Sequence, residues 1–131
     1  MGSFSNYLEN KILDHIFGKA SYTSPTIYLG LSTDDPLDDG SGLAEPIGNS
    51  YERVQTSAAD WNVALVGTID NANGITFPEA TGNWGTVTHF ALFDAATAGN
   101  MLAYGALSQS KAINSGDTAK FDVGDLDVSL D

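Results

Sequence analysis

Four aspartates in one loop are the residues of this sequence whose type and spacing best suit metal binding. They lie in a glycine-containing stretch over residues 33–50, with Glu45 nearby, and are Asp34, Asp35, Asp38 and Asp39. Calcium takes about six to eight oxygen ligands, and such a loop can supply several. The spacing does not match an EF-hand, because Leu37 and Pro46 would fall at its third and twelfth positions. A solvated acidic loop is the simpler interpretation, a weak calcium site is the alternative, and no cofactor is expected.

The two histidines lack the neighbours that nucleophilic catalysis requires. His15 falls near the C-terminal end of a predicted helix, where a cation is favourable. His89 falls within the most apolar predicted strand. The sequence has no cysteine, no Gly-x-Ser-x-Gly elbow, no phosphate-binding loop and no dinucleotide fingerprint. We therefore expect structural roles for both histidines and predict that the chain is not an enzyme.

Glu79 and Trp84 raise the alternative of a carbohydrate site, because such sites pair carboxylates with aromatic rings. A glycosidase needs two placed carboxylates, and acidic residues are so frequent here that chance pairs are common. Trp84 lies in a loop over residues 79–85 with a glycine directly after it. This loop is predicted to display Trp84 as a contact residue.

One amphipathic helix is predicted over residues 6–17. Its apolar residues recur at helical spacing, at Leu8, Ile12, Leu13, Ile16 and Phe17. Asn6 is the expected N-cap, with Glu9 three residues on, and Gly18 is the expected C-terminal cap. The apolar stripe can pack on the chain's own sheet or on a neighbour, so Leu8, Ile12, Ile16 and Phe17 are candidate interface residues.

From about residue 26 the apolar residues alternate with a period of two, which predicts strands. Thr86–Asp94 is expected to be central and buried on both faces, and a turn at residues 98–100 joins it to the next strand as a hairpin. In Asp125–Leu130, every second residue is expected to point inward. The predicted strands are Thr26–Ser32, Tyr51–Thr56, Trp61–Leu65 (with a bulge at Ala58-Ala59 before it), Ile75–Phe77, Thr86–Asp94, Met101–Leu107, Lys111–Ile113, Thr118–Val123 and Asp125–Leu130.

These elements predict a mainly β fold, an antiparallel β-sandwich or jelly-roll-like domain with one N-terminal amphipathic α-helix. The length of 131 residues suits a single domain over residues 1–131.

The chain has 17 acidic and 5 basic residues, for a net charge of -12. Binding to nucleic acid or anionic lipid requires clustered lysine and arginine, so neither is expected. No signal peptide or apolar run long enough to span a membrane is visible.

Several segments together resemble a family of small virion proteins of tailed bacteriophages. The most specific segment is Ile75–Asp94, and the resemblance extends over nearly the whole chain. The other matching segments are Tyr7–Gly18, Tyr28–Thr33 with the following Asp/Gly loop and Glu45-Pro46, Tyr51–Val54, Leu102–Leu107, Ser115–Asp117 and Leu126–Leu130.

The resemblance implies a non-enzymatic structural protein of the virion, made in the host cytoplasm. Its partners would be other virion proteins and further copies of itself in a homo-oligomer. We expect first a capsid-decoration or cement protein present in many copies, because the chain is short and has no fibrous repeat. The alternative is a tail, baseplate or tail-fibre-associated protein involved in host contact. A calcium-dependent carbohydrate-binding module is a third interpretation.

Overall fold

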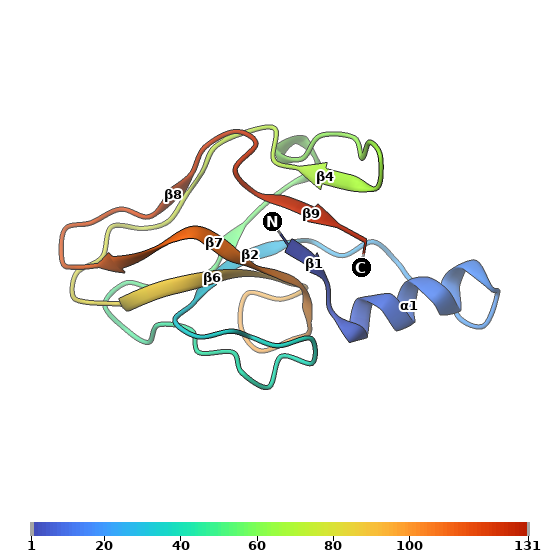
Figure 1. Ribbon diagram of the computed structural model, residues 1–131, viewed down its shortest axis with the longest axis horizontal. Helices are drawn as coiled ribbons and strands as arrows, with labels where there is room; N and C mark the ends of the chain where they lie inside the picture. The colour runs from blue at the N-terminus through green and yellow to red at the C-terminus, as the bar shows by residue number, and fades with distance from the viewer. Residues whose placement is uncertain (1, 131) are drawn as a thin grey trace.

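The computed structural model describes residues 2–130, which form nine strands and one α-helix (Figure 1). The helix α1 spans Asn6–Ile16, and no helix in the described range is long and apolar enough to cross a membrane. The strands are β1 (Gly2–Phe4), β2 (Tyr28–Ser32), β3 (Val54–Gln55), β4 (Thr68–Asp70), β5 (Ile75–Thr76), β6 (Gly85–Phe93), β7 (Met101–Ile113), β8 (Lys120–Phe121) and β9 (Asp127–Ser129). The predicted class, mainly β with one N-terminal helix, is confirmed, and Met1 and Asp131 of the predicted domain lie outside the described residues.

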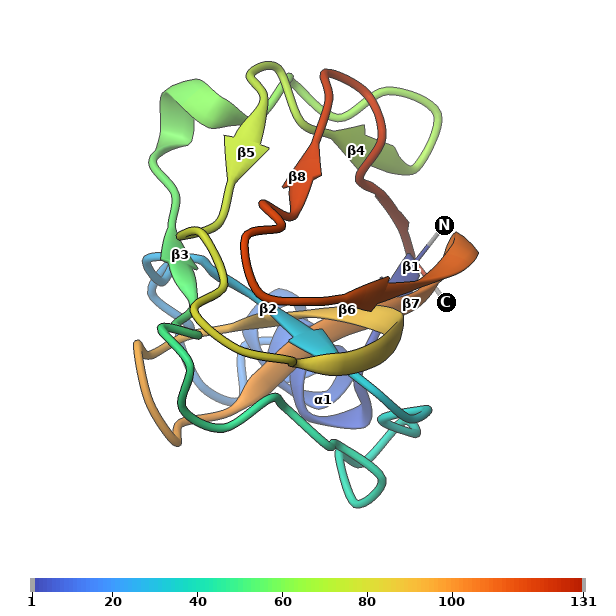
Figure 2. The same cartoon turned by 90° about the vertical axis from the view of Figure 1, so that its left-hand side faces the viewer.

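Seven strands form one sheet in the order β3-β2-β6-β7-β1-β9-β4, and β5 and β8 pair separately. Every pair is antiparallel except β1 with β9, so the sheet is mixed and departs from the antiparallel expectation at this point. Figure 2 shows the sheet curling, with the β5–β8 ribbon facing β6 and β7. The sandwich-like layering therefore arises from one curled sheet covered by a short ribbon.

β1 has no signal in the sequence, because its three residues are too few to show a period. It pairs with β7 on one side and β9 on the other. A Cβ atom at Gly2 would lie 2.7 Å from Phe90 Cζ and 2.8 Å from the carbonyl oxygen of Tyr104. Only glycine allows the backbone of β1 to lie this close to Phe90 and Tyr104.

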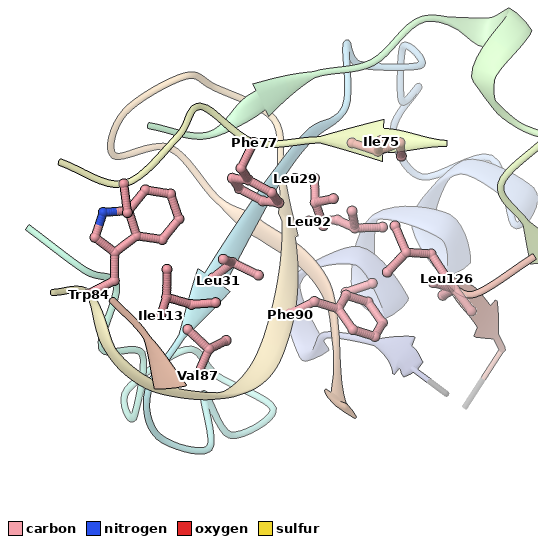
Figure 3. Close-up of a cluster of buried hydrophobic side chains, with 13 residues drawn as sticks. Leu29, Leu31, Ile75, Phe77, Trp84, Val87, Phe90, Leu92, Ile113 and Leu126 are labelled. Carbon is pink, nitrogen blue, oxygen red and sulfur yellow. The ribbon is translucent and has the colours of Figure 1, made fainter. Parts of the chain in front are cut away.

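β6 is an interior strand of the sheet, between β2 and β7, and its residues Phe90–Phe93 are buried on both faces, as predicted. Phe90 and Leu92 belong to the larger hydrophobic cluster, which Figure 3 shows in close-up. Ala91 and Phe93 belong to the smaller cluster, built with residues of β2, β7 and the acidic loop. A strand covered on both faces reads as a continuous apolar run, which is why the sequence locates it well.

Two residues face differently from the prediction. Val87 shares the parity of Ala91 and Phe93, yet it joins the larger cluster. The register between β6 and β7 shifts between Val87 and His89, and a bulge of this kind turns one side chain to the other face. Leu130 is 63% exposed because β9 ends one residue before it.

Most of the other predicted strands are found with different bounds. The predicted strands over residues 101–107 and 111–113 join into β7, which pairs with β6 as the expected hairpin. The predicted strand over residues 118–123 is reduced to β8. Residues 33–53 contain no helix or strand, in agreement with the predicted loop over residues 33–50.

The segment between residues 51 and 71 differs most from the prediction. Only two residues of the predicted strand Tyr51–Thr56 pair, as β3. The expected bulge at Ala58-Ala59 is a 3-10 turn, η1 (Ala58–Asp60). The predicted strand Trp61–Leu65 makes isolated bridges only. These bridges join it in a hairpin to the segment of β4, and β4 itself was not predicted.

A tight turn at Val66-Gly67 closes this hairpin. Leu65 and Thr68 exchange both backbone hydrogen bonds, at 2.9 and 3.1 Å. Val66 and Gly67 have φ values of 53° and 72°, the signs that a type I′ turn requires. Asparagine is favoured at the first of these positions, whereas a β-branched residue with positive φ is strained. Val66 is also 94% exposed, so no contact within the described chain compensates this strain.

Replacing Val66 by asparagine should therefore stabilise the isolated protein. We expect Val66→Asn to raise the free energy of unfolding by about 1 kcal/mol, because it relieves left-handed strain. Chemical denaturation measures the change. Leu65→Asn, at a neighbouring exposed position without positive φ, is the matched control and should not stabilise. Equal effects of the two substitutions would mean that strain at Val66 is not the cause.

Candidate functional site

α1 leaves the sheet at an anchored residue and projects from the body of the molecule (Figure 1). Ser5 is fully buried and caps the helix. Its hydroxyl accepts the Leu8 N–H at 3.3 Å and donates to the Met101 carbonyl at 2.6 Å. The prediction of Asn6 as the cap is wrong, since Asn6 is the first residue of the helix. Ser5 caps the helix and also bonds to the first residue of β7, and no local sequence pattern reveals this second contact.

The apolar stripe of α1 is buried only at its base. Leu8 is 9% exposed where the helix packs against β1 and β7, and Ile12 is half-buried. Farther along, Leu13, Ile16 and Phe17 are 55%, 69% and 74% exposed. These three residues are called the helix patch below. Among the predicted interface residues, Leu8 is therefore used by the fold itself, whereas Ile16 and Phe17 face solvent.

The end of α1 is closed by a turn that directs the chain back toward the sheet. Gly18 adopts a φ of 74°, as predicted for a C-terminal cap. The Lys19 and Ala20 N–H groups both donate to the Asp14 carbonyl, at 2.8 and 3.2 Å. The Tyr22 N–H donates to His15 Nδ1 at 3.1 Å. His15 therefore holds the turn beside the helix patch in place, which is a structural role.

A second group of exposed apolar residues lies on the hairpin before β4. Val63, Leu65 and Val66 are 92%, 77% and 94% exposed and form what is called the hairpin patch below. Figure 1 shows α1 and β4 toward the same end of the molecule, on either side of β9. This end, with both patches, is called the apolar end. The hairpin patch was not predicted from the sequence, because Trp61–Leu65 was expected to form a strand.

Charge is distributed unequally between the apolar end and the rest of the chain. Residues 1–22 contain two of the 17 acidic and two of the 5 basic residues, so their net charge is zero. Residues 61–67 contain no charged side chain. The whole formal charge of -12 is therefore carried by the remainder of the chain. The two segments that carry the patches are therefore neutral, whereas the protein as a whole is strongly acidic.

The acidic loop folds through its own aspartates. Asp35 Oδ1 accepts the Leu37 N–H at 3.0 Å, and Asp39 Oδ1 accepts the Ser41 N–H at 2.9 Å. The hydrogen bonds with Ser41 lower the pKa of Asp39. The two other predicted calcium ligands bond elsewhere, Asp34 to the next N–H of the chain and Asp38 to the Tyr104 hydroxyl. Within residues 2–130, no group of three or more acidic, histidine or cysteine side chains is placed to hold a metal ion.

A partly buried ion pair ties the acidic loop to the sheet. The Arg53 guanidinium contacts the Glu45 carboxylate through Nε at 3.0 Å and Nη2 at 2.8 Å. Its Nη1 donates to the carbonyls of Ala95 and Ala98, and the guanidinium lies 3.5 Å from the centre of the Phe93 ring. The Arg53 side chain is only 6% exposed. One arginine thus joins the acidic loop, β6 and the turn after β6.

The Tyr51 hydroxyl completes this network. It donates to Glu45 Oε1 at 2.7 Å and accepts the Leu31 N–H at 2.9 Å. Burial raises the pKa of Tyr51, and the hydrogen bond to Glu45 raises it further. The phenol therefore remains protonated well above the pH at which an exposed tyrosine ionises.

Trp84 is buried, and the prediction that its loop displays it is wrong. The side chain is 4% exposed, and its indole N–H donates to the Asn49 carbonyl at 2.9 Å. Its ring packs edge-on against Tyr51, with ring centroids 5.2 Å apart, and against Phe77, with ring centroids 6.3 Å apart. Figure 3 shows Trp84 and Phe77. Trp84 fastens the end of the acidic loop to the core. It is therefore not available as a platform for a sugar beside the exposed Glu79.

His89 occupies a structural position between β6 and the acidic loop. Its Nδ1 lies 2.8 Å from the Thr88 hydroxyl, and its Nε2 lies 3.9 Å from Asp35 Oδ1. Ser32 is its partner across the sheet. That serine is fully buried, and its hydroxyl bonds to the Asp34 carbonyl and the Ala44 N–H. The serine hydroxyl is thus held by the loop, in a position without access for a substrate.

Removing the arginine should destabilise the protein strongly. Arg53→Ala leaves Glu45 without its cation and two carbonyls without a donor. Loss of one partner of a fully buried ion pair costs about 3–5 kcal/mol, and because the Glu45 side chain is 21% exposed, we expect a loss of about 2–4 kcal/mol. Urea denaturation measures the loss. Lys120→Ala is the control, since Lys120 pairs with Asp122 at 3.6 Å on an exposed surface and should contribute less than about 1 kcal/mol. Similar losses for the two variants would contradict the proposed role of Arg53.

The raised pKa of Tyr51 predicts a particular alkaline instability. A folded-state pKa above the unfolded one gives stability that is present below the unfolded value and lost as pH rises. The unfolded phenol ionises near pH ~10, so above it stability should fall by up to about 1.4 kcal/mol per pH unit. Tyr51→Phe should be less stable than the unaltered protein at neutral pH, but it should not show this additional loss of stability at alkaline pH. Parallel pH profiles of the two proteins, measured by urea denaturation, would contradict the assignment.

Comparison with known proteins assigns the chain to a family. No curated protein sequence matches the chain. A family model described as Podophage GP4 fiber I protein gp80 matches residues 3–129. The match covers almost the whole chain, including α1 and all of the sheet except the first residue of β1. The chain therefore belongs to this family of phage fibre proteins, which are structural proteins of the virion.

Proposed function

We propose that the protein is a non-enzymatic subunit of a podophage fibre, and that it joins neighbouring virion proteins through the apolar end. The observation that carries this proposal is the exposure of Ile16 and Phe17, at 69% and 74%, on the apolar stripe of α1. The family description as a fibre protein supports a place in the fibre. Capsid decoration, the first expectation from the sequence, has no comparable support.

The exposed stripe favours a partner on energetic grounds. An amphipathic helix is stabilised mainly by packing of its apolar face, and helices shorter than about 12 residues are marginal alone. α1 has 11 residues, and only its base is packed on the sheet. Burying one large apolar side chain contributes about 1.5–3 kcal/mol. A partner that covers the helix patch would therefore stabilise both the contact and the helix.

The hairpin patch adds an independent reason. Val66 combines positive φ with 94% exposure, at a turn position where asparagine would be less strained. Strain of this kind persists at sites where the side chain is needed for function. Burial of Val66 against a neighbouring protein would be such a function. The same end of the molecule then carries both contact elements.

The acidic body favours the same orientation. Contacts between strongly acidic surfaces of neighbouring subunits are repulsive, and they require counterions. Residues 1–22 and 61–67, which carry the two patches, have no net charge, so contacts through them avoid this repulsion. The protein is thus expected to assemble by its apolar end and to present its acidic surfaces to solvent.

The number of copies per particle tests the location. We expect quantitative mass spectrometry of purified virions to give a small copy number compared with the capsid protein, and an antibody label to lie on the fibres in electron micrographs. A copy number comparable to that of the capsid protein, with the label spread over the capsid, would instead establish decoration.

The helix patch can be tested in the phage itself. We expect Ile16→Gln with Phe17→Gln to reduce incorporation into virions by about tenfold or more, because two apolar contacts are lost, each worth roughly 1.5–3 kcal/mol. Glutamine is a good helix former, so α1 should still form. Val123→Gln, at a 64% exposed valine after β8, is the matched control. Normal incorporation of the double variant would exclude the helix patch as the contact.

A further inference from the structure

We propose that the Asn73-Gly74 step is a modification site, at which the asparagine side chain cyclises onto the next backbone nitrogen and is converted into aspartate and isoaspartate. The inference stands apart from the proposed function, because the reaction needs no second protein. Its product nevertheless alters the base of the hairpin that carries the hairpin patch.

Asn73 is followed by the residue that least hinders such a cyclisation. The sequence has nine asparagines, and only Asn73 precedes a glycine. The reaction joins the asparagine side chain to the backbone nitrogen of the next residue, so a side chain on that residue obstructs the approach. Glycine has no side chain, and its backbone rotates more freely than that of other residues. The sequence therefore favours this one position.

The structure leaves both residues free to react. Asn73 and Gly74 are exposed and lie in a bend between Asn71 and β5, outside any helix or strand. Within residues 2–130 the Gly74 N–H donates to no acceptor, so its nitrogen is not held in a hydrogen bond. No strand pairing therefore opposes the rotation that brings this nitrogen to the amide carbon of Asn73.

The leaving group of the reaction lies between two oxygen atoms. Asn73 Nδ2 donates to Asp60 Oδ1 at 3.1 Å and to the Ala59 carbonyl at 3.2 Å. The hydrogen bond from the Ser57 N–H, together with that from Asn73, lowers the pKa of Asp60, so its carboxylate is charged at neutral pH. Positive charge develops on Nδ2 when it takes up a proton to leave as ammonia. A carboxylate in contact with that nitrogen stabilises this charge.

The reaction balances with water as the only co-reactant. The Gly74 nitrogen forms a bond to Asn73 Cγ and loses its proton to solvent. The bond from Cγ to Nδ2 breaks, and ammonia leaves with a proton taken from solvent. Water then opens the resulting succinimide ring on either side of the shared nitrogen. Cleavage next to Cγ gives aspartate, and cleavage next to the backbone carbonyl carbon gives isoaspartate.

The conversion places two carboxylates at the base of the hairpin. Asp60 and Asn73 flank the two ends of the hairpin, which are joined by the bridge between Trp61 and Asn71. The amide that donates to Asp60 and Ala59 is lost, and a second negative charge then faces Asp60. Like charges this close repel each other. We therefore expect η1 and the base of the hairpin to loosen while the rest of the fold is retained.

Peptide mass spectrometry of the purified full chain, kept warm at neutral pH, tests the reaction. Aspartate and isoaspartate should accumulate at position 73 about tenfold faster than at Asn114, an exposed asparagine that precedes Ser115. Gly74→Ala should slow the conversion to the rate at Asn114. The added Cβ would lie 3.6 Å from the Phe121 carbonyl oxygen, an ordinary contact, so the fold is kept. Conversion at position 73 no faster than at Asn114 would overturn the proposal.

The contribution of Asp60 is tested by removing its charge. Asp60→Asn keeps an oxygen that can accept the Ser57 N–H, so η1 should still form, but the conversion of Asn73 should slow several-fold. Circular dichroism confirms that the variant is folded. Unchanged or faster conversion would show that the carboxylate does not stabilise the leaving group and would overturn this part of the proposal.

The structural consequence is tested with a variant that has the aspartate product from the start. In Asn73→Asp, hydrogen exchange of the backbone N–H groups over residues 57–62 should be several-fold faster than in the freshly purified unaltered chain. Asn114→Asp adds the same charge away from the hairpin and is the matched control. Equal exchange over residues 57–62 in the two variants would overturn the proposed loosening.

Discussion

Ser5 is the only residue between β1 and α1, and its hydrogen bonds determine where the helix points. Its N–H donates to the Leu102 carbonyl at 2.8 Å, and its hydroxyl joins the Met101 carbonyl to the first turn of the helix. Since β1 is held between β7 and β9, the direction of α1 is fixed by the sheet. The helix has no flexible connection through which its apolar face could fold back onto the core. The exposure of the helix patch is therefore a consequence of this one junction.

Arg53 secures the acidic loop against the sheet. The acidic loop contains no helix or strand, and its aspartates mainly close local turns. Arg53, through Glu45 and the carbonyls of Ala95 and Ala98, gives this loop a defined place beside β6. Trp84 fastens its end through Asn49. The body is thus rigid and acidic, and its exposed apolar residues are concentrated on α1 and the hairpin before β4, with a few isolated ones elsewhere.

Sequence patterns located the elements whose signal is local and repeated. α1 was predicted from five apolar positions, and β6 from a run that is apolar on both faces. Elements that depend on tertiary contacts were missed. β1 has three residues without a period, and β4 is a strand because it pairs with β9, which lies far along the chain. Trp84 was expected in solvent because glycine usually marks an exposed loop, and nothing local shows that Asn49 accepts its N–H.

The same limit applies to the candidate site. Periodicity identified which residues of α1 are apolar, but it could not separate Leu8, which the fold buries, from Phe17, which it leaves exposed. That difference depends on the direction in which the helix leaves the sheet after Ser5. The acidic loop was a reasonable candidate for calcium by composition alone. In the structure each of these aspartates accepts a hydrogen bond from a different donor, so they hold the conformation of the loop.

The central claim is that the outer turns of α1 are exposed in the isolated chain and covered in the particle. Hydroxyl-radical footprinting measures this directly, because trypsin cuts after Lys11 and Lys19 and releases the helix patch as one peptide, Ile12–Lys19. We predict that oxidation of this peptide is strong in the free protein and falls several-fold in the virion. The peptide that follows Lys120 and contains Val123 should be oxidised equally in both. Equal oxidation of Ile12–Lys19 in the free protein and in the virion would contradict the account.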